Sequence, residues 1–505
     1  MAAGPTAAFV AVDIGASSGR VILGRITRPD SGGTAATPRL RMEVVHRFPN
    51  GVIRHEGHLR WDFDTLFEEV LVGLTEAATV AAAQGKRIIS IGIDTWAVDY
   101  GLVDPAGDLT AQPISYRDDR TRAAIEQVHR SVDQARLYST TGLQFLPFNT
   151  VYQLAAEPSL NGVQALLIPD LIAYRLTGER RTESTNASTT GLFDAVAGEW
   201  ATEFHEALGL PTDLFPPLVE AGRPVGVLLP EITGRTNLPT ATKVVAVGSH
   251  DTASAVAAVP AESPHFAYIS SGTWSLVGLE LRHPVLTEAS RAANFTNERG
   301  VDGTIRYLRN VGGLWLLSEC QRTWAEEGTD EPLGSLLAAA AVLPAGGPLV
   351  DVDDPAFIAP GDMPRRIQQA AVGIEPGLLD HPAAIVRCIL DSLAVGYART
   401  LADAERLTDT RVEVVHVVGG GSQNQLLCQL TADATGKPVI AGPVEATALG
   451  NLLVQARASG HLDGGLSSLR RLVAAGREPA RYEPRRTAPP STTDLTSVPI
   501  GRTSP

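Results

Sequence analysis

The amino-acid sequence predicts an α/β protein made of two similar halves. Two segments, residues 9–24 and 266–280, share the pattern of an apolar strand, a short turn of small residues and a second apolar strand. A third segment, residues 245–260, joins a β-branched strand to an apolar run of helical type through a polar bend. Strands alternating with helices are typical of α/β folds, and a hairpin repeated in each half indicates an internal duplication.

Composition excludes several classes of function. The chain of 505 residues has a net charge of −14, spread without long blocks of one sign, which argues against nucleic acid or an anionic membrane as the main partner. No apolar run approaches the ~20 residues of a membrane span, and the N-terminus lacks the basic start of a signal peptide. Cys320, Cys388 and Cys428 are far apart and predict free thiols in a reducing cytoplasm.

The turn of the first hairpin predicts a phosphate site. Residues 15–19 read Gly-Ala-Ser-Ser-Gly, so backbone N–H groups can approach an anion closely. Asp13 ends the preceding strand, where an acidic group near a phosphate requires a Mg²⁺ ion between them. Taken alone, the segment is equally well a plain glycine hairpin with a solvated Asp.

The next segments give a buried strand and a helical region. Residues 88–100 form a strand that runs into Trp96 and flanking polar groups, which suit a sugar face, although Trp96 is equally an ordinary core residue. Helices are expected over residues 124–132, 151–156 and 164–176, the last with a break at Pro169. The small polar run 183–191 is a loop near the ligand or a capped connection.

Asp251 lies at the junction of strand and helix in residues 245–260. A carboxylate held there can accept a proton from an attacking hydroxyl, but Asp is also a common helix N-cap. Taken alone, the segment favours the interpretation of Asp251 as a helix cap. The rest of the chain favours the interpretation of Asp251 as a catalytic base.

The second half repeats the hairpin and then adds a glycine triplet. Helices are expected after Gly313 and over residues 333–343, 382–401 and 445–457, with a short strand at 438–442. Residues 411–436 read as a strand, the glycines 419–421 and a helix, which offers a flat backbone surface for a base or ribose. The triplet lacks the last glycine of the dinucleotide fingerprint, and the chain has no P-loop sequence.

Across these segments the chain resembles the FGGY carbohydrate kinases of the actin, hexokinase and heat-shock ATPase superfamily. The resemblance covers roughly residues 9–460 and depends on eight ordered motifs: DIGASSGR, GIDTWAVDY, YRDDRT, GSHDTAS, SSGTWS, NFTNE, GGGSQNQLLCQLTAD and GPVEATALGN. It implies two ribonuclease-H-like domains around a cleft, residues 1–247 and 248–460, followed by a C-terminal segment, 461–505, with a disordered Pro/Ser/Thr-rich tail.

The resemblance also implies the activity, which is transfer of the ATP γ-phosphoryl group to O1 of L-rhamnulose with Mg²⁺. Asp251 is the implied base, and the sugar contacts would be Ala97, His250, Asp251, Thr252 and Asn310. The nucleotide and its phosphates would contact Ala16, Ser17, Ser18, Gly19, Arg20, Thr273, Ser318 and Gly420, with Asp13 near the metal.

Two positions depart from the family pattern. Ala97 replaces a common Gly near the sugar, and Ser318 replaces a common Gln near the nucleotide. One added methyl group is worth ~1–3 kcal/mol of discrimination, so the class of substrate is better determined than the sugar itself. The alternatives are a kinase for L-fuculose, xylulose or another polyol, and a regulator that binds sugar and nucleotide without transfer. The sequence gives no indication of oligomeric state.

Overall fold

The structure is a computed structural model that describes residues 6–27, 38–329, 331–371, 377–476 and 479–485. The chain divides into two compact units, each formed by segments that are distant in sequence. The first contains residues 1–262, 280–307 and 446–478, and the second contains residues 263–279, 308–445 and 479–505. Among the described residues, no helix has the length and apolar character needed to cross a membrane.

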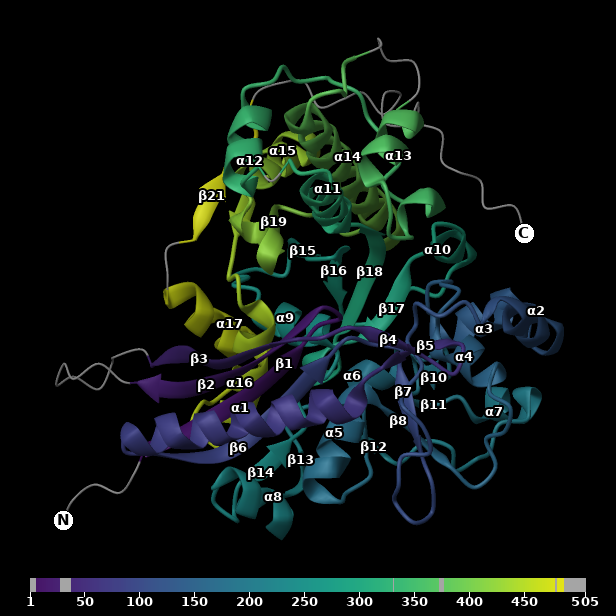
Figure 1. Cartoon of the computed structure of the whole chain (residues 1–505), viewed down its shortest axis with the longest axis vertical. Coiled ribbons are helices and arrows are strands. Elements are labelled where there is room, and N and C mark those ends of the chain that lie inside the picture. Colours follow the sequence, from purple (N-terminus) through teal and green to yellow (C-terminus); the bar gives the residue numbers. More distant parts are fainter. Residues whose placement is uncertain (1–5, 28–37, 330, 372–376, 477–478, 486–505) are drawn as a thin grey trace. The chain divides into compact units, whose positions relative to one another are not determined.

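A six-stranded mixed sheet forms the centre of the first unit (Figure 1). Its strand order is β13 (Pro224–Val227), β14 (Lys243–Val245), β6 (Lys86–Thr95), β1 (Thr6–Ile14), β2 (Ser18–Thr27) and β3 (Arg39–Pro49). β1 and β2 form the predicted antiparallel hairpin, and β6 lies parallel to β1 on its other side. The apolar run of β1 is buried from Ala8 onwards because both faces of the sheet are covered.

Two helices cover opposite faces of this sheet. α1 (Phe63–Ala83) begins at the N-cap Asp62 and places Gly73 against Val21 of β2. α16 (Ala446–Ala458) returns from the far end of the chain and places Leu452 against Gly24, on the other face of β2. A side chain at either glycine would overlap its neighbour, so the close approach of helix and strand requires glycine there.

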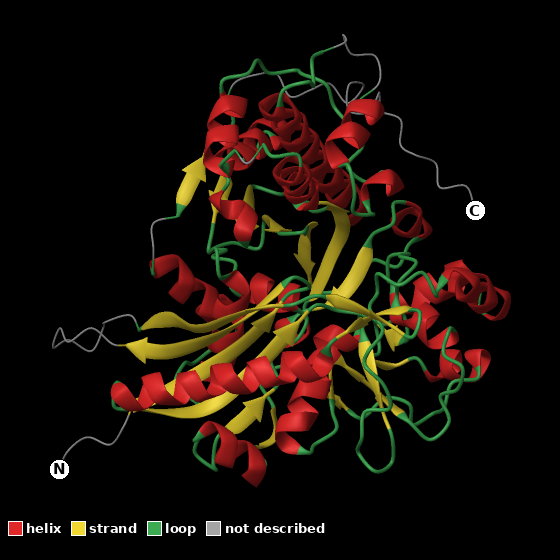
Figure 2. Cartoon of the chain, viewed as in Figure 1, coloured by secondary structure: helices red, strands yellow, loops and turns green. Residues whose placement is uncertain are grey.

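The rest of the first unit consists of short strands, helices and the connections between them (Figure 2). A second apolar cluster forms where β7 and β8 pair beside α2, α4 and α7. These elements are β4 (Val52–His55), β5 (His58–Trp61), β7 (Tyr100–Val103), α2 (Arg122–Ser131), α3 (Gln134–Thr141), α4 (Thr150–Ala155), β8 (Gln164–Leu167), α5 (Ile168–Thr177), β9 (Thr182–Glu183), α6 (Ser184–Ala187), β10 (Phe193–Asp194), β11 (Glu199–Trp200), α7 (Thr202–Leu208), β12 (Leu218–Val219), α8 (Pro230–Thr236), α9 (Asp251–Ala257), α10 (Glu288–Ala292), β17 (Thr296–Arg299), η1 (Val301–Gly303) and α17 (Leu466–Ala475).

The second unit repeats the topology at the start of the first. β15 (Phe266–Ser271) pairs antiparallel with β16 (Trp274–Leu281) and parallel with β19 (Val414–Val418), as β1 does with β2 and β6. β20 (Val439–Ala441) and β21 (Ala480–Tyr482) extend the sheet beyond β19. The duplication expected from the two hairpins is therefore confirmed at the level of strand pairing.

Some helices of the second unit were predicted from the sequence and others were not. The longest is α14 (Pro382–Thr408), and the others include α11 (Trp315–Glu326), α12 (Leu333–Ala341), η2 (Pro355–Phe357), α13 (Met363–Ala370), η3 (Gly420–Gln423) and α15 (Gln425–Thr435). The helices α11, α12, α14 and α15 match predicted ones in position, whereas η2 and α13 were not predicted. β18 (Ile305–Gly312) precedes α11, and its residues up to Tyr307 belong to the first unit.

One expected helix is partly wrong. The sequence predicts a helix over residues 164–176 that is interrupted at Pro169. In the structure, Gln164–Leu167 is instead strand β8 and pairs antiparallel with β7. Pro169 lies in the first turn of α5, where its missing N–H costs no hydrogen bond. The expected disordered tail lies mainly in residues 486–505, outside the described residues.

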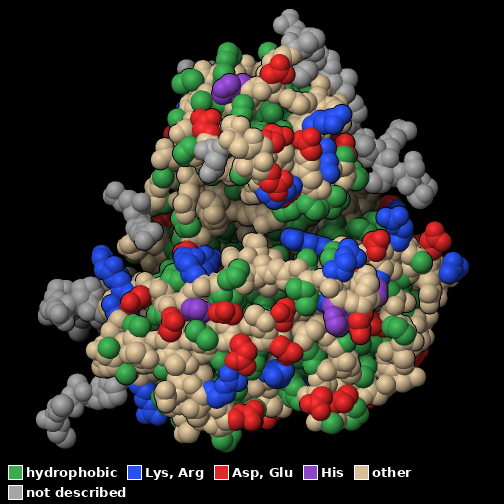
Figure 3. All heavy atoms as spheres, in the orientation of Figure 1, with side chains coloured by type: hydrophobic (Ala, Val, Ile, Leu, Met, Phe, Trp, Pro, Cys, Tyr) green, Lys and Arg blue, Asp and Glu red, His purple; other side chains and the backbone are tan. Residues whose placement is uncertain are grey.

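Charged side chains are mixed on the face of the molecule that Figure 3 shows. Acidic and basic side chains alternate across the described surface on that face and form no extended patch of a single sign. This distribution follows the scattered charges in the sequence. This face therefore offers a polyanion no continuous basic track.

Candidate active site

Three acidic side chains lie at one edge of the first unit's sheet. Asp13 at the end of β1 and Asp94 near the end of β6 are direct neighbours in the parallel register. The segment after β14 continues along this edge, because Thr95 forms a parallel bridge with His250 and its N–H donates to the Ser249 carbonyl at 2.9 Å. The carboxyl ends of parallel strands are where open α/β sheets bind ligands, and here they carry Asp13, Asp94 and Asp251.

Asp13 and Arg20 form an ion pair across the first hairpin. They are opposite each other in the strand register, and the Arg20 guanidinium donates to Asp13 Oδ2 at 2.9 Å. The turn between them is tight, with the Gly15 N–H donating to the Ser18 carbonyl at 2.9 Å, and Ser17 and Ser18 are exposed. Gly19 has a packing role, since a side chain there would overlap the Phe48 ring of β3.

Asp94 is fully buried, and the sequence analysis assigned it no role at the site. Its Oδ2 accepts a hydrogen bond from Asn451 Nδ2 of α16 at 2.5 Å, whereas its buried Oδ1 has no hydrogen-bond partner among the described residues. Burial and the neighbouring Asp13 carboxylate raise the pKa of Asp94 well above its usual value. A buried carboxylate oxygen without a partner, beside a second carboxylate, fits a site for a cation.

Asp251 is the first residue of α9 and follows the N-cap residue, His250, so it does not occupy the capping position. Oδ1 accepts a hydrogen bond from Thr252 Oγ1 at 3.0 Å and lies 3.3 Å from His250 Nε2. The side chain is 34% exposed, and the described residues give Oδ2 no hydrogen-bond or ion-pair partner. The capping interpretation is therefore wrong for the Asp251 side chain, and one of its oxygens is available to a ligand.

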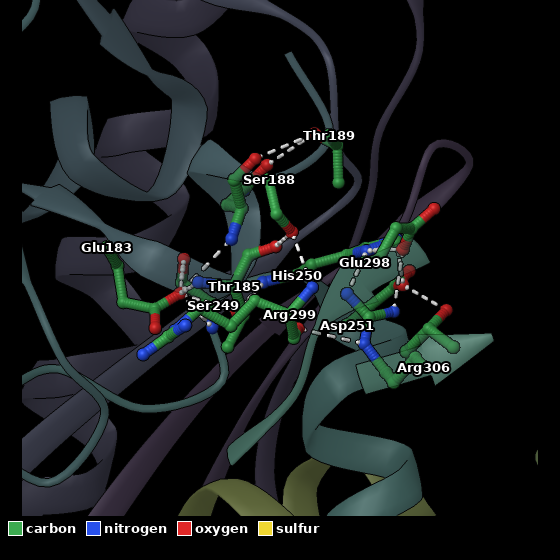
Figure 4. A network of polar contacts seen from close by, with 12 residues as sticks. Glu183, Thr185, Ser188, Thr189, Ser249, His250, Asp251, Glu298, Arg299 and Arg306 are labelled. Carbon is green, nitrogen blue, oxygen red and sulfur yellow. Dashed lines mark hydrogen bonds and ion pairs between the residues drawn. The ribbon is translucent and has the colours of Figure 1, made fainter. Parts of the chain in front are cut away.

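The bend before α9 is held by a buried carboxylate (Figure 4). Glu183 Oε2 accepts hydrogen bonds from the Ser249 N–H at 3.1 Å and from Ser249 Oγ at 2.8 Å. The same oxygen caps α6 by accepting from the N–H groups of Thr185 and Asn186. The run 183–191 is thus a capped helix start, as one of the two interpretations expected, and it also fixes the bend beside Asp251.

Ala97 lies in a constrained loop after β6. Val98 has a φ of 68°, which is unfavourable for a β-branched residue, and its carbonyl accepts a hydrogen bond from Thr150 Oγ1 at 2.7 Å. Beyond it, Asp99 Oδ2 accepts from Trp61 Nε1 at 2.6 Å and from Trp96 Nε1 at 3.0 Å. Trp96 is 6% exposed, and its ring packs against Trp61 in a tilted arrangement with the ring centroids 4.3 Å apart, so it is a core residue here. Ala97 is only partly buried.

The second unit has an edge of its own. The turn of the β15–β16 hairpin is fixed to the start of α11, because the Trp315 N–H donates to the Thr273 carbonyl at 3.2 Å. Gly313 allows this approach, since a side chain there would overlap the Thr273 backbone. Thr273 and Ser318 of α11 are both exposed, so the side chains of both are open to a ligand.

The glycine triplet lies at the same end of the second sheet as this turn. Gly419 has a φ of 79°, and a side chain on Gly421 would overlap Ser271 at the end of β15. Gly420 is exposed and has no atom near the position of a side chain, which leaves a flat backbone surface. Asn424 caps α15 by accepting from the Leu427 N–H at 3.0 Å.

The predicted site residues therefore fall into two groups. The first unit contains Asp13, Ala16, Ser17, Ser18, Gly19, Arg20, Ala97, His250, Asp251 and Thr252. The second unit contains Thr273, Asn310, Ser318 and Gly420. Asn310 lies on β18, whose neighbouring Arg309 forms an ion pair with Asp353 at 2.9 Å.

Sequence reasoning missed several buried acidic and basic residues around the first group: Asp94, Asp99, Glu183, Glu298 and Arg306. Asp94 and Asp99 lie in the recognised motif GIDTWAVDY and Glu298 lies in NFTNE, and for Asp94 the available signal was an acid towards the end of a predicted strand. Glu183 begins the polar run 183–191, but its partner Ser249 is 66 residues away, and Arg306 lies 56 residues from His250, so the sequence carries no signal for either contact.

Two family profiles together match nearly the whole chain. Residues 8–258 match the N-terminal domain of the FGGY family of carbohydrate kinases, and residues 267–459 match its C-terminal domain. Curated relatives that the chain is similar to have the name rhamnulokinase. The protein from Bacteroides thetaiotaomicron is 40% identical over 483 residues, covering 94% of this chain and 96% of the relative. The one from Klebsiella pneumoniae is 43% identical over 452 residues, covering 88% of each chain.

Solved structures show the same fold at much lower identity. A xylulose kinase from Rhodospirillum rubrum aligns with a TM-score of 0.75 at 19% identity, covering 95% of this chain and 94% of that one. Plasmodium falciparum glycerol kinase with ADP aligns with a TM-score of 0.73 at 14% identity, covering 96% and 95%. The expected two-domain α/β fold is confirmed.

Proposed function

The chain belongs to the FGGY family of carbohydrate kinases, and we propose that it phosphorylates L-rhamnulose at O1 with ATP, a step of L-rhamnose catabolism. The products are L-rhamnulose 1-phosphate and ADP. Membership of the family implies small-molecule substrates, a sugar and ATP. The choice of sugar is supported by the relatives with the name rhamnulokinase, which align with this chain over about nine-tenths of its length.

The proposal depends mainly on the contacts of the two carboxylate oxygens of Asp251. Its Oδ1 is held by Thr252 and faces His250, while Oδ2 has no partner among the described residues. In the proposed reaction Oδ2 accepts the proton of the O1 hydroxyl as O1 bonds to the γ-phosphorus. The bond from that phosphorus to the bridging oxygen breaks, and ADP leaves with its electron pair. His250, Thr252 and Ala97 would contact the sugar around this base.

The remaining predicted residues are proposed as nucleotide contacts in each unit taken by itself. In the first unit, the N–H groups of residues 16–19 and the Arg20 side chain are proposed to bind phosphate oxygens. In the second unit, Thr273, Ser318 and Gly420 are proposed to contact the nucleotide, and Asn310 the substrate. This assignment is supported by the exposure of Thr273, Ser318 and Gly420 at the edge of their sheet. The functional halves 1–247 and 248–460 stay a prediction.

Mg²⁺ is proposed to bind at the first acidic edge. Among the described residues, no group of three or more Asp, Glu, His or Cys could hold a metal alone. Mg²⁺ in kinases usually takes one or two carboxylates together with substrate phosphates, and the neighbouring Asp13 and Asp94 fit that pattern. When bound, the ion would neutralise phosphate charge. Arg20 supports Asp13 from the other side at 2.9 Å.

The test is ADP release from Mg²⁺-ATP with L-rhamnulose, in parallel with L-fuculose, D-xylulose and no sugar. Turnover that depends on L-rhamnulose is the expected result. Turnover with another ketose alone would leave the proposed mechanism unchanged. It would indicate that Ala97 and its loop select a sugar other than L-rhamnulose. Release that does not depend on sugar, or no release, would support the regulator instead. The buried free thiols Cys320, Cys388 and Cys428 are compatible with the predicted cytoplasmic location.

A further inference from the structure

A buried ion pair lies directly behind the histidine next to Asp251 (Figure 4). Glu298 of β17 and Arg306 of β18 are 4% and 0% exposed, and Arg306 Nη1 lies 2.8 Å from Glu298 Oε2. Arg306 is itself anchored, because its Nε donates to the Arg299 carbonyl of β17 at 3.1 Å. The pair is therefore a rigid part of the first unit.

Both members of the pair contact the same nitrogen of His250. Nδ1 lies 3.2 Å from Glu298 Oε2 and 3.2 Å from Arg306 Nη2. The contact with Arg306 Nη2 is a hydrogen bond, which the guanidinium donates to an unprotonated Nδ1, and the contact with Glu298 Oε2 is an ion-pair contact. Together the two contacts fix the position of the ring.

The other nitrogen of the ring then has a fixed direction. Nε2 lies 3.3 Å from Asp251 Oδ1, the same oxygen that accepts the hydrogen bond from Thr252. Two neighbours therefore hold Oδ1, and the carboxylate plane is set so that Oδ2 is left for a ligand. His250 is also fixed through its backbone, since its N–H donates to Thr185 Oγ1 at 3.4 Å.

Stability alone is a poor reason for this arrangement. Burying two charges costs several kcal/mol per ion, and apolar residues of similar size usually stabilise a core at least as well. Burial would raise the pKa of Glu298, yet Arg306 and His250 hold that pKa below its usual value. The carboxylate therefore stays charged where it faces His250.

We propose that Glu298 and Arg306 are a positioning pair that acts through His250 to orient the Asp251 carboxylate toward the sugar hydroxyl. Neither residue touches substrate in this scheme. The inference depends on the proposed role of Asp251 as the base. It adds that the reaction requires a buried pair on β17 and β18 in addition to His250, Asp251 and Thr252.

The test is a double-mutant cycle between Glu298 and His250. Glu298→Gln keeps the size of the side chain but removes its charge, so His250 is held less firmly and Asp251 is less well aligned. A misalignment of this kind lowers turnover by ~10²-fold. In a His250→Asn background the same substitution should change kcat by less than about threefold, because residues that act through one another are not additive. Each variant is assayed with Mg²⁺-ATP and the sugar that supports the wild-type enzyme.

Glu280→Gln is the matched control. Glu280 is a partly buried carboxylate of the same unit, paired with Arg470 at 2.6 Å, and its contacts within the described part of the chain do not include His250. Thermal melting shows whether both Glu→Gln variants are folded and similarly destabilised, while only Glu298→Gln should lose turnover. If Glu298→Gln does not fold, Glu298→Asp keeps the negative charge but shortens the side chain, which withdraws the carboxylate from His250 as well as from Arg306, and the same kinetic loss is expected.

Two results would overturn the inference. One is wild-type turnover in Glu298→Gln or, where that variant does not fold, in Glu298→Asp. The other is an unchanged loss from the substitution in the His250→Asn background, which would indicate a purely structural role. Failure of the proposed function is a separate outcome, because the wild-type enzyme would then show no sugar-dependent ADP release.

Discussion

Replacing Asp251 with Asn removes a proton acceptor while keeping the shape of the side chain. The amide oxygen of Asn can still accept the hydrogen bond that Thr252 Oγ1 donates at 3.0 Å. The variant therefore separates the chemistry of the carboxylate from its place in the bend. We expect turnover to fall steeply while the sugar still binds.

The effect of the substitution on catalysis can be compared with its effect on folding stability. General-base catalysis contributes ~10²–10⁴-fold, which is about 3–5 kcal/mol of transition-state stabilisation. Loss of a negative charge from the first turn of α9 costs only ~0.3–1 kcal/mol of folding free energy, and the side chain is 34% exposed. The catalytic effect is thus several times larger than the structural one, so the variant should be folded and nearly inactive.

The assay is ADP release at saturating sugar, combined with calorimetric titration of the sugar to measure its Kd. We expect kcat to fall at least 100-fold and Kd to change by less than about threefold. Asp133→Asn is a matched control, since Asp133 caps α3 through a hydrogen bond from the Ala135 N–H at 2.9 Å and lies outside the predicted site. A kcat within tenfold of the wild type would refute the assignment of Asp251 as the base.

Three further predictions follow from the geometry. Gly313→Ala should displace the turn at Thr273 from α11, cost ~1–3 kcal/mol of folding free energy, and raise the KM for ATP but not for the sugar; steady-state kinetics with an unchanged KM for ATP would contradict it. Burial raises the pKa of Asp99 from 3.8 to about 6, so the folded protein holds this proton more tightly than the unfolded chain does. The free energy of unfolding should therefore fall by ~3 kcal/mol as the pH rises from 3.8 to about 6. The check is urea unfolding of the wild type and of Asp99→Asn at several pH values, and a stability difference that does not vary with pH would exclude this effect. Ala97→Gly should change the ratio of kcat/KM between L-rhamnulose and L-fuculose by ~10-fold or more, since one methyl group beside the sugar is removed; an unchanged ratio would place Ala97 outside the sugar site.

Much of the local structure was predictable because it depends on near neighbours in the chain. The hairpin β1–β2 and its repeat β15–β16 follow from apolar runs separated by small turn residues. The segment Gln164–Leu167 was assigned wrongly because a short apolar run next to a helix has no period of its own. It is a strand only because β7 offers it a partner.

The role of Asp251 shows the same limit at the site. The sequence places an acid at a strand-to-helix junction, where capping and catalysis need the same residue type. The tertiary structure decides against the cap, because Thr252 and His250 hold the Asp251 carboxylate beside the helix end. Those contacts depend on side-chain rotation, which no spacing in the sequence specifies.

The sequence by itself determined the family, the duplicated α/β architecture and the residues of the two hairpin turns, since these are carried by contiguous motifs in a fixed order. Only the tertiary structure placed Asn451 against Asp94, Glu183 against Ser249, and Arg306 with Glu298 behind His250. The first two contacts join elements that are distant in the chain, and the consecutive strands β17 and β18 meet His250 only in the folded structure. Buried polar groups require such partners, and the partners are chosen by the fold as a whole.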